Sequence, residues 1–104
     1  MVDLTVVILT KNEENNLRKC IESLKGIVKR FVIVDSYSTD GTKALCEELS
    51  KRVNLDFYEN KFIDHATQMN WGLKNTNITT EWTMRIDADE EITLELVKEI
   101  EERL

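Results

Sequence analysis

Two continuous apolar runs rich in β-branched residues constrain the fold of this chain more than any other feature. They occupy residues 4–9 and 31–34, and neither alternates polar with apolar side chains as a half-exposed strand would. Such runs are typical of strands buried on both faces, which occur mainly in parallel sheets covered by helices. Apolar residues at helical spacing follow the first run over residues 14–24, and Gly26 can end that helix. The sequence therefore predicts an α/β fold.

The rest of the chain continues this alternation. Shorter strands are expected at residues 55–58 and 82–86. Helices are expected to begin after Thr39 or Asp40, after Asp64 and after Thr93, whose side chains can accept a hydrogen bond from a first helical turn. The side chains expected to face the core are Leu17, Cys20, Ile21 and Leu24 in the first helix, Leu45, Leu49 and Val53 in the second, Phe62, Ala66, Met69 and Leu73 in the third, and Val97, Ile100 and Leu104 in the last.

This order of elements predicts an open, mostly parallel Rossmann-like sheet with helices on both faces, formed by residues 1–104 as a single domain. In a sheet of strand order 3-2-1-4, the first and fourth strands are neighbours, and ligands bind where their carboxyl ends meet. Residues 10–12 follow the first strand, residues 87–89 follow the fourth, and Asp35 ends the second. We therefore expect these three groups to meet in one crevice.

Acidic side chains crowd the end of the fourth strand, where Asp87, Asp89, Glu90 and Glu91 lie close together. If the strand continues through Ala88, Asp87 and Asp89 point the same way and repel each other. A cation between them would relieve the repulsion, and oxygen ligands favour Mg²⁺ or Mn²⁺. The alternative is that these residues only form a turn and cap the next helix.

The chain lacks the glycine-rich motifs that hold phosphates with backbone amides. Neither G-x-G-x-x-G nor G-x-x-x-x-G-K is present, so a cation on Asp87 and Asp89 is the expected means of binding a diphosphate. Asp35 lies where an acidic residue of dinucleotide-binding folds accepts a hydrogen bond from a ribose or base. We expect a similar role for it here.

Three segments together resemble the N-terminal part of a family 2 glycosyltransferase, a GT-A-fold enzyme that uses a nucleotide-diphosphate sugar. They are residues 6–17, residues 32–42 and the D-x-D motif at 87–89, in the order and spacing of the family, and they extend over nearly the whole chain. Ser36 and the Asp-Ala-Asp-Glu sequence also resemble a subgroup of bacterial lipopolysaccharide-core glucosyltransferases. The resemblance implies an inverting transfer of sugar to an acceptor hydroxyl.

The resemblance also implies roles for individual residues. The nucleotide contacts of the family fall on Thr10, Asn12, Glu13, Asp35 and Asp87, and its contacts to Mg²⁺ or Mn²⁺ fall on Asp87 and Asp89. A UDP-sugar is the expected donor, and a glycan or lipid-linked molecule is the expected acceptor. Tyr37 stands where the family usually has glycine, and Ser36 where it usually has a second aspartate, so the base preference stays open.

Several residues near the expected site keep two interpretations. Arg85 could reach a phosphate or pair with the acidic residues at 90–91. Gln68 and Asn70 lie on a helix that borders the site in the family and are candidates for it. His65 has no Cys or His partner at ligand spacing, so it is expected on a helix surface rather than in a metal site.

No general base can be assigned to the transfer reaction. In the family, the base and the acceptor-binding surface come from a second half that follows D-x-D, whereas here one helix follows Asp89. We therefore expect this chain to be a donor-binding half without the acceptor-binding half. Completion of the enzyme by an oligomer or by a partner protein is left open. A non-catalytic nucleotide-binding or regulatory α/β module is the alternative function. A receiver domain, however, needs acidic residues directly after the first strand, where this chain has Thr-Lys-Asn at 10–12.

Composition excludes other classes of protein. A net charge of -6 argues against a nucleic-acid binder, which needs a basic face. The two cysteines fall on predicted helices and are expected to be free thiols. The acidic residue at position 3 is unlike a signal peptide, so a cytoplasmic location is expected. Lys25, Lys29 and Arg30 are expected in a solvated loop, with contact to the inner face of a membrane left open.

Overall fold

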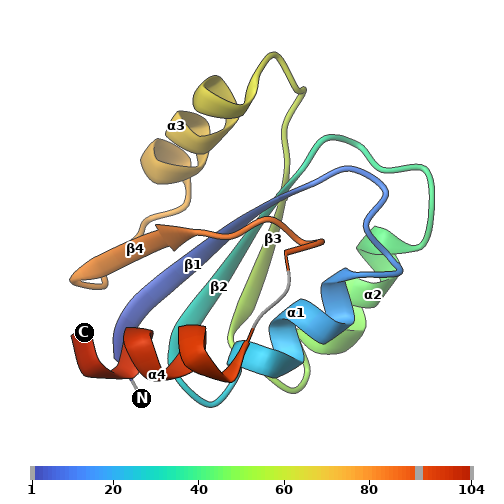
Figure 1. Ribbon diagram of the computed structural model, residues 1–104. Coiled ribbons are helices and arrows are strands. Elements are labelled where there is room, and N and C mark those ends of the chain that lie inside the picture. Colours follow the sequence, from blue (N-terminus) through green and yellow to red (C-terminus); the bar gives the residue numbers. More distant parts are fainter. Residues whose placement is uncertain (1, 91–92, 104) are drawn as a thin grey trace.

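The computed structural model describes residues 2–90 and 93–103, in which strands and helices alternate along the chain (Figure 1). The strands pair in parallel in the order β3-β2-β1-β4, so the predicted α/β class and strand order are confirmed. Within the described residues, no helix combines the length and the apolar character that crossing a membrane requires. The elements are β1 (Val2–Thr10), α1 (Leu17–Leu24), β2 (Val28–Asp35), α2 (Thr42–Leu49), β3 (Leu55–Glu59), α3 (His65–Asn75), β4 (Trp82–Arg85) and α4 (Leu94–Arg103).

Helices cover the two faces of the sheet unequally (Figure 1). Helices α1, α2 and α4 lie on one face, where Ile21, Cys46 and Ile100 share a core with the strand residues on that side. Helix α3 lies on the other face, and its Met69 packs against a small cluster formed by Val7, Val32 and Val34. Because both faces of β1 and β2 are covered, their apolar side chains are buried in both directions, as their unbroken runs predicted.

The faces predicted for α1 and α2 differ in accuracy. In α1, all four predicted positions are buried, which confirms the sequence pattern. In α2, the buried positions are Thr42, Cys46 and Leu49, while Leu45 is only half-buried. Both cysteines are free, as predicted. Burial raises the pKa of Cys20 to about 11 and that of Cys46 to about 12, so these thiols stay protonated and unreactive at neutral pH.

Helix α3 meets the sheet with only part of the predicted face, because Met69 packs there while Ala66 is exposed. Its buried residues are Gln68 and Gly72, whereas the predicted core residues Phe62 and Leu73 are each 43% exposed. A β-carbon on Gly72 would lie 3.1 Å from Val34 Cγ2, so the helix backbone approaches the sheet closely at this point. That close approach selects the face with the smallest side chain, which hydrophobic periodicity cannot detect.

The predicted caps of the last two helices are confirmed. The Thr67 N–H donates to Asp64 Oδ1 at 2.7 Å, and this bond holds the pKa of the Asp64 carboxyl below its usual value. The Leu96 N–H donates to Thr93 Oγ1 at 3.1 Å. Of the side chains predicted to face inward in α4, Ile100 is buried, Val97 is half-buried, and Leu104 lies outside the described residues.

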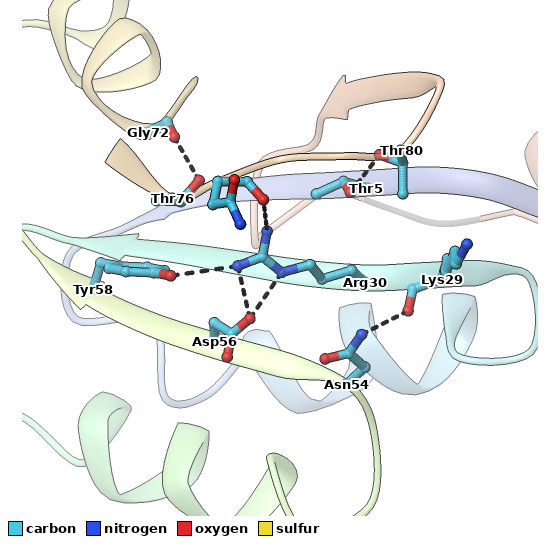
Figure 2. Close-up of polar contacts among 10 residues, drawn as sticks. Thr5, Lys29, Arg30, Asn54, Asp56, Tyr58, Gly72, Thr76 and Thr80 are labelled. Atoms are coloured by element: carbon cyan, nitrogen blue, oxygen red, sulfur yellow. Dashed lines mark hydrogen bonds and ion pairs between the residues drawn. The ribbon is translucent and has the colours of Figure 1, made fainter. Parts of the chain in front are cut away.

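Arg30 attaches the loop after α3 to the sheet (Figure 2). Its guanidinium donates to Asp56 Oδ2 at 2.8 Å, to the Tyr58 hydroxyl at 3.3 Å and to the Asn77 carbonyl at 3.2 Å. The side chain is only 16% exposed. The prediction that Arg30 lies in a solvated loop is therefore wrong, because β2 begins at Val28 and carries Arg30 into the sheet.

Candidate functional site

A cleft of about 290 Å³ opens at the carboxyl ends of β1 and β4. The strand order reverses between these neighbours, because the chain runs from β1 to β2 and β3 on one side and returns to β4 on the other, which is the arrangement that creates a binding crevice in open α/β folds. The cleft lies where the sequence predicted a crevice. Its lining residues are Leu9, Thr10, Lys11, Glu13, Ser36, Phe62, His65, Arg85, Asp87, Ala88 and Asp89.

The D-x-D motif reaches the cleft through a turn rather than through a continued strand. Strand β4 ends at Arg85, and the Glu90 N–H donates to the Asp87 carbonyl at 3.0 Å, which closes a turn around Ala88. The strand therefore does not continue through Ala88, which was the condition under which Asp87 and Asp89 were expected to point the same way. Ala88 is nevertheless buried while Asp87 and Asp89 are exposed, and both carboxylates line the cleft.

Arg85 pairs with Asp87 rather than with Glu90. Its guanidinium donates to Asp87 Oδ1 at an N···O distance of 3.0 Å. Within residues 2–90 and 93–103, Asp89 has no comparable partner. Position 91 lies outside the described residues, so the pairing with Glu90 is the part of that expectation that the structure overturns. The two carboxylates of the motif thus differ in their surroundings.

Asp35 lies beneath the cleft rather than on its surface. The side chain is 1% exposed and accepts hydrogen bonds from the Thr10 hydroxyl at 2.6 Å, the Ser38 hydroxyl at 2.6 Å and the Ser38 N–H at 2.7 Å. These bonds join the end of β1 to the turn after β2. A contact between Asp35 and a nucleoside therefore stays a prediction, and it would require at least one of these bonds to open.

Asn12 joins two loops beside the cleft and does not line it. Its Oδ1 accepts hydrogen bonds from the Thr39 N–H at 2.8 Å and from the Asp40 N–H at 3.2 Å, and its own N–H donates to Ser38 Oγ at 2.8 Å. The adjacent Glu13 does line the cleft, while its N–H donates to Thr42 Oγ1 at 2.9 Å. Of the six predicted site residues, the structure brings Thr10, Glu13, Asp87 and Asp89 to one cleft.

Lys11 holds the turn that follows β2. Its Nζ donates to the Ser36 carbonyl at 3.0 Å and to the Tyr37 carbonyl at 2.9 Å. Tyr37 has a φ of 56°, in the left-handed region that favours glycine. The structure thereby gives a physical reason for the glycine expected at this position, and Lys11 offsets some of the strain that a side chain introduces there.

The start of α3 contributes an aromatic pair to the cleft. The Phe62 and His65 rings meet edge to face with centroids 5.2 Å apart, and both residues line the cleft. Hydrophobic periodicity placed Phe62 in the core and missed this role. The signal that could have found it is position, because the residues around an amino-terminal helix cap lie beside the carboxyl ends of parallel strands.

The other two candidates on α3 do not line the cleft. Gln68 is buried and donates through Nε2 to Ser36 Oγ at 3.2 Å and to the Asn60 carbonyl at 3.0 Å. It therefore braces the lining residue Ser36 from below. Asn70 is exposed elsewhere on the helix.

The cleft suits a hard divalent cation that is shared with a bound ligand. Among the described residues, no three His, Cys, Asp or Glu side chains gather as a complete metal site. Asp87 and Asp89 offer carboxylate oxygens only, and Mg²⁺ commonly binds one or two carboxylates together with substrate phosphates and water. The donor set fits such an ion, provided that a diphosphate completes its coordination.

A sequence model for the family described as glycosyl transferase family 2 matches residues 5–104, which is nearly the whole chain. The chain belongs to glycosyltransferase family 2. The family expected from the three sequence motifs is therefore confirmed.

Relatives in bacteria agree with this family. An uncharacterized glycosyltransferase of Rickettsia felis is 35% identical over 101 residues, which cover 97% of this chain and 34% of that protein. A lipopolysaccharide core biosynthesis glycosyltransferase of Rhizobium meliloti, LpsC, is 38% identical over 90 residues, which cover 86% of this chain and 32% of that protein. The chain thus spans about a third of the length of the curated relatives it matches.

A solved crystal structure resembles the structure closely. The crystal structure of residues 1–349 of S. aureus TarS superposes with a TM-score of 0.79 at 25% identity, over 98% of this chain and 32% of that one. The complex of the same TarS fragment with UDP-GlcNAc gives a TM-score of 0.79, over 98% of this chain and 30% of that one. The predicted Rossmann-like fold is confirmed by this similarity.

Proposed function

We propose that this chain is the donor-binding part of an inverting family 2 glycosyltransferase. Asp87 and Asp89 would hold Mg²⁺ or Mn²⁺, and the cation would bind the diphosphate of a UDP-sugar. The observation that carries the proposal is the convergence of both D-x-D carboxylates with Thr10 and Glu13 in one cleft at the switch point of the sheet. The complex of TarS with UDP-GlcNAc supports the same class of donor.

The composition of the cleft separates the parts of such a donor. The carboxylates and Arg85 lie on the side of β4, which suits the diphosphate. Ser36, Phe62 and His65 lie on the opposite side and continue into a cavity of about 530 Å³ that they share with Lys11. An aromatic edge beside polar groups is typical of a surface that receives a base or ribose. We assign the nucleoside to that side.

The proposed reaction is attack of an acceptor hydroxyl on the anomeric carbon of the sugar, with departure of the diphosphate. A bound divalent cation would stabilise the charge of the leaving diphosphate. Thr10 and Glu13 would contact the nucleotide, and Asp87 and Asp89 would hold the cation. The acceptor is expected to be a glycan or a lipid-linked molecule. None of the residues that line the cleft is proposed as the general base or as a contact to the acceptor. A cytoplasmic location, with or without contact to a membrane, is part of this proposal.

Thermal unfolding with UDP tests the donor site. UDP in large excess over its dissociation constant should raise the melting temperature by about 5 °C or more when Mn²⁺ is present, and far less in a chelator. The carboxylates repel a free diphosphate, so the cation is required. Equal stabilisation in a chelator would contradict the proposal.

A matched pair of variants locates the cation. Asp89→Asn should weaken Mn²⁺-dependent UDP binding about tenfold or more while leaving the apo protein as stable as before, because Asp89 is exposed. Glu102→Gln removes one negative charge from an exposed position outside the cleft and should leave UDP binding unchanged. Loss of apo stability in Asp89→Asn would show that the motif is structural.

A further inference from the structure

Arg85 forms an ion pair with Asp87, one of the two carboxylates that the proposed metal ion needs. Its guanidinium lies 3.0 Å from Asp87 Oδ1, and both residues line the cleft. The side chains are 38% and 55% exposed, so water surrounds the pair. Ion pairs this exposed are weak and exchange readily with other ions.

The end of β4 directs Arg85 toward the cleft rather than into the core. Arg85 lies opposite Val7 in the sheet, and the following Ile86 N–H donates to the Val7 carbonyl at 3.1 Å. Ile86 and Ala88 are buried, whereas Arg85, Asp87 and Asp89 are exposed. Alternating exposure therefore places the Arg85 guanidinium and both carboxylates along one side of this segment.

The charge inside the cleft leaves a role for a second cation besides the metal. A divalent ion cannot by itself neutralise two carboxylates and a diphosphate, so positive side chains are needed nearby. Lys11 and Arg85 are the lysine and arginine of the lining, and Lys11 already donates to two backbone carbonyls. Arg85 has only the Asp87 carboxylate as its partner within residues 2–90 and 93–103, and a metal would compete for that carboxylate.

We propose that Arg85 changes partners when the donor binds. Before binding, it holds Asp87; when the cation takes Asp87, the guanidinium turns to the diphosphate and donates two hydrogen bonds to it. The planar guanidinium fork matches phosphate oxygens in this way, whereas an ammonium group does not. This inference rests on the proposed donor site and adds a phosphate-binding residue to it.

The exchange predicts opposite effects on two affinities. Without Arg85, Mn²⁺ alone should bind about threefold more tightly, because an ion competing for Asp87 has been removed. UDP in the presence of saturating Mn²⁺ should bind about tenfold or more weakly, because hydrogen bonds to a charged group are lost. Uridine, which has no phosphate, should bind equally to both proteins.

The experiment compares Arg85→Gln, Arg85→Lys and the control Arg52→Gln by titration calorimetry with UDP and uridine, and by electron paramagnetic resonance with Mn²⁺. Arg52 is an exposed arginine whose guanidinium lies 3.9 Å from Glu48, away from the cleft lining. Arg52→Gln should behave as wild type. Arg85→Lys should retain wild-type Mn²⁺ affinity but lose part of the UDP affinity.

Three results would overturn the inference. Unchanged affinities in Arg85→Gln would make the pair a surface feature without function. Weaker binding of both Mn²⁺ and UDP would show that Arg85 orients Asp87 for the metal instead of competing with it. Weaker binding of uridine would show a general loss of the site. If wild type itself binds Mn²⁺ but not UDP, the proposed donor site fails, and a threefold gain in Mn²⁺ affinity would still support the competition for Asp87.

Discussion

The position of Asp35 was predicted correctly, but its hydrogen-bond partners were not. The end of a buried strand placed it at the edge of the crevice, and the structure agrees to that extent. Its hydrogen-bond partners follow from the turn at Tyr37, whose φ of 56° brings Ser38 back onto the carboxylate. A left-handed conformation is not expected from the residue type of Tyr37, so this residue alone could not have predicted these bonds, although the glycine usual at this position in the family is consistent with the turn.

The first prediction at this scale concerns stability. Asp35→Ala should lower the free energy of unfolding by about 2 kcal/mol, because it leaves the buried Thr10 hydroxyl and the half-buried donors of Ser38 without their acceptor. Ser38→Ala, which leaves the Thr10 bond in place, should cost about half as much. Urea unfolding measures both values. An Asp35→Ala protein as stable as wild type would show that the carboxylate is not held by these bonds in solution.

The same variant tests nucleoside recognition separately. If Asp35 also contacts the base or ribose, Asp35→Ala should weaken uridine binding with or without Mn²⁺, whereas Ser38→Ala should have a smaller effect. The titration must be made where both variants remain folded. Unchanged uridine affinity would assign Asp35 to the turn alone.

At the scale of elements, the sequence predicted the strands better than the helix faces. Residues 4–9 and 31–34 are central strands because their apolar runs require burial on two sides, and only the middle of a covered sheet provides that. The face predicted for α3 was wrong except at Met69, because the packing of this helix follows from Gly72, which contributes no hydrophobicity. Hydrophobic periodicity detects apolar side chains, but it cannot detect a glycine at a packing contact.

Arg30 provides a prediction about how elements hold together. Arg30→Met should lower the free energy of unfolding by about 2 kcal/mol, because Asp56, Tyr58 and the carbonyl of Asn77 lose a shared donor whose own side chain is only 16% exposed. The neighbouring Lys29 is 58% exposed and pairs with Asp3 at 3.4 Å, so Lys29→Met should change stability by less than about 0.5 kcal/mol. Equal losses in the two variants would argue that Arg30 contributes only surface charge.

At the scale of the whole molecule, the chain corresponds to about a third of its relatives. We predict that these 104 residues bind a metal-loaded sugar nucleotide but form no glycoside with simple acceptors. An inverting transfer needs a base on the acceptor side, whereas Glu13, Asp87 and Asp89 all line the cleft assigned to the donor. Incubation with a panel of UDP-sugars should release UDP slowly at most. Efficient glycoside formation by the isolated chain would place the base within these residues.

The unequal covering of the sheet has a consequence for local unfolding. Helix α3 is the one helix over Val7, Val32 and Val34 in the described part of the chain, and its first turn also contributes His65 to the cleft. Detachment of that single element would expose the valine cluster and disassemble one wall of the cleft in the same event. Such cooperative units open with their own free energy, below that of global unfolding. A ligand that contacts this wall would therefore slow hydrogen exchange around the valine cluster, including amides of residues that do not line the cleft.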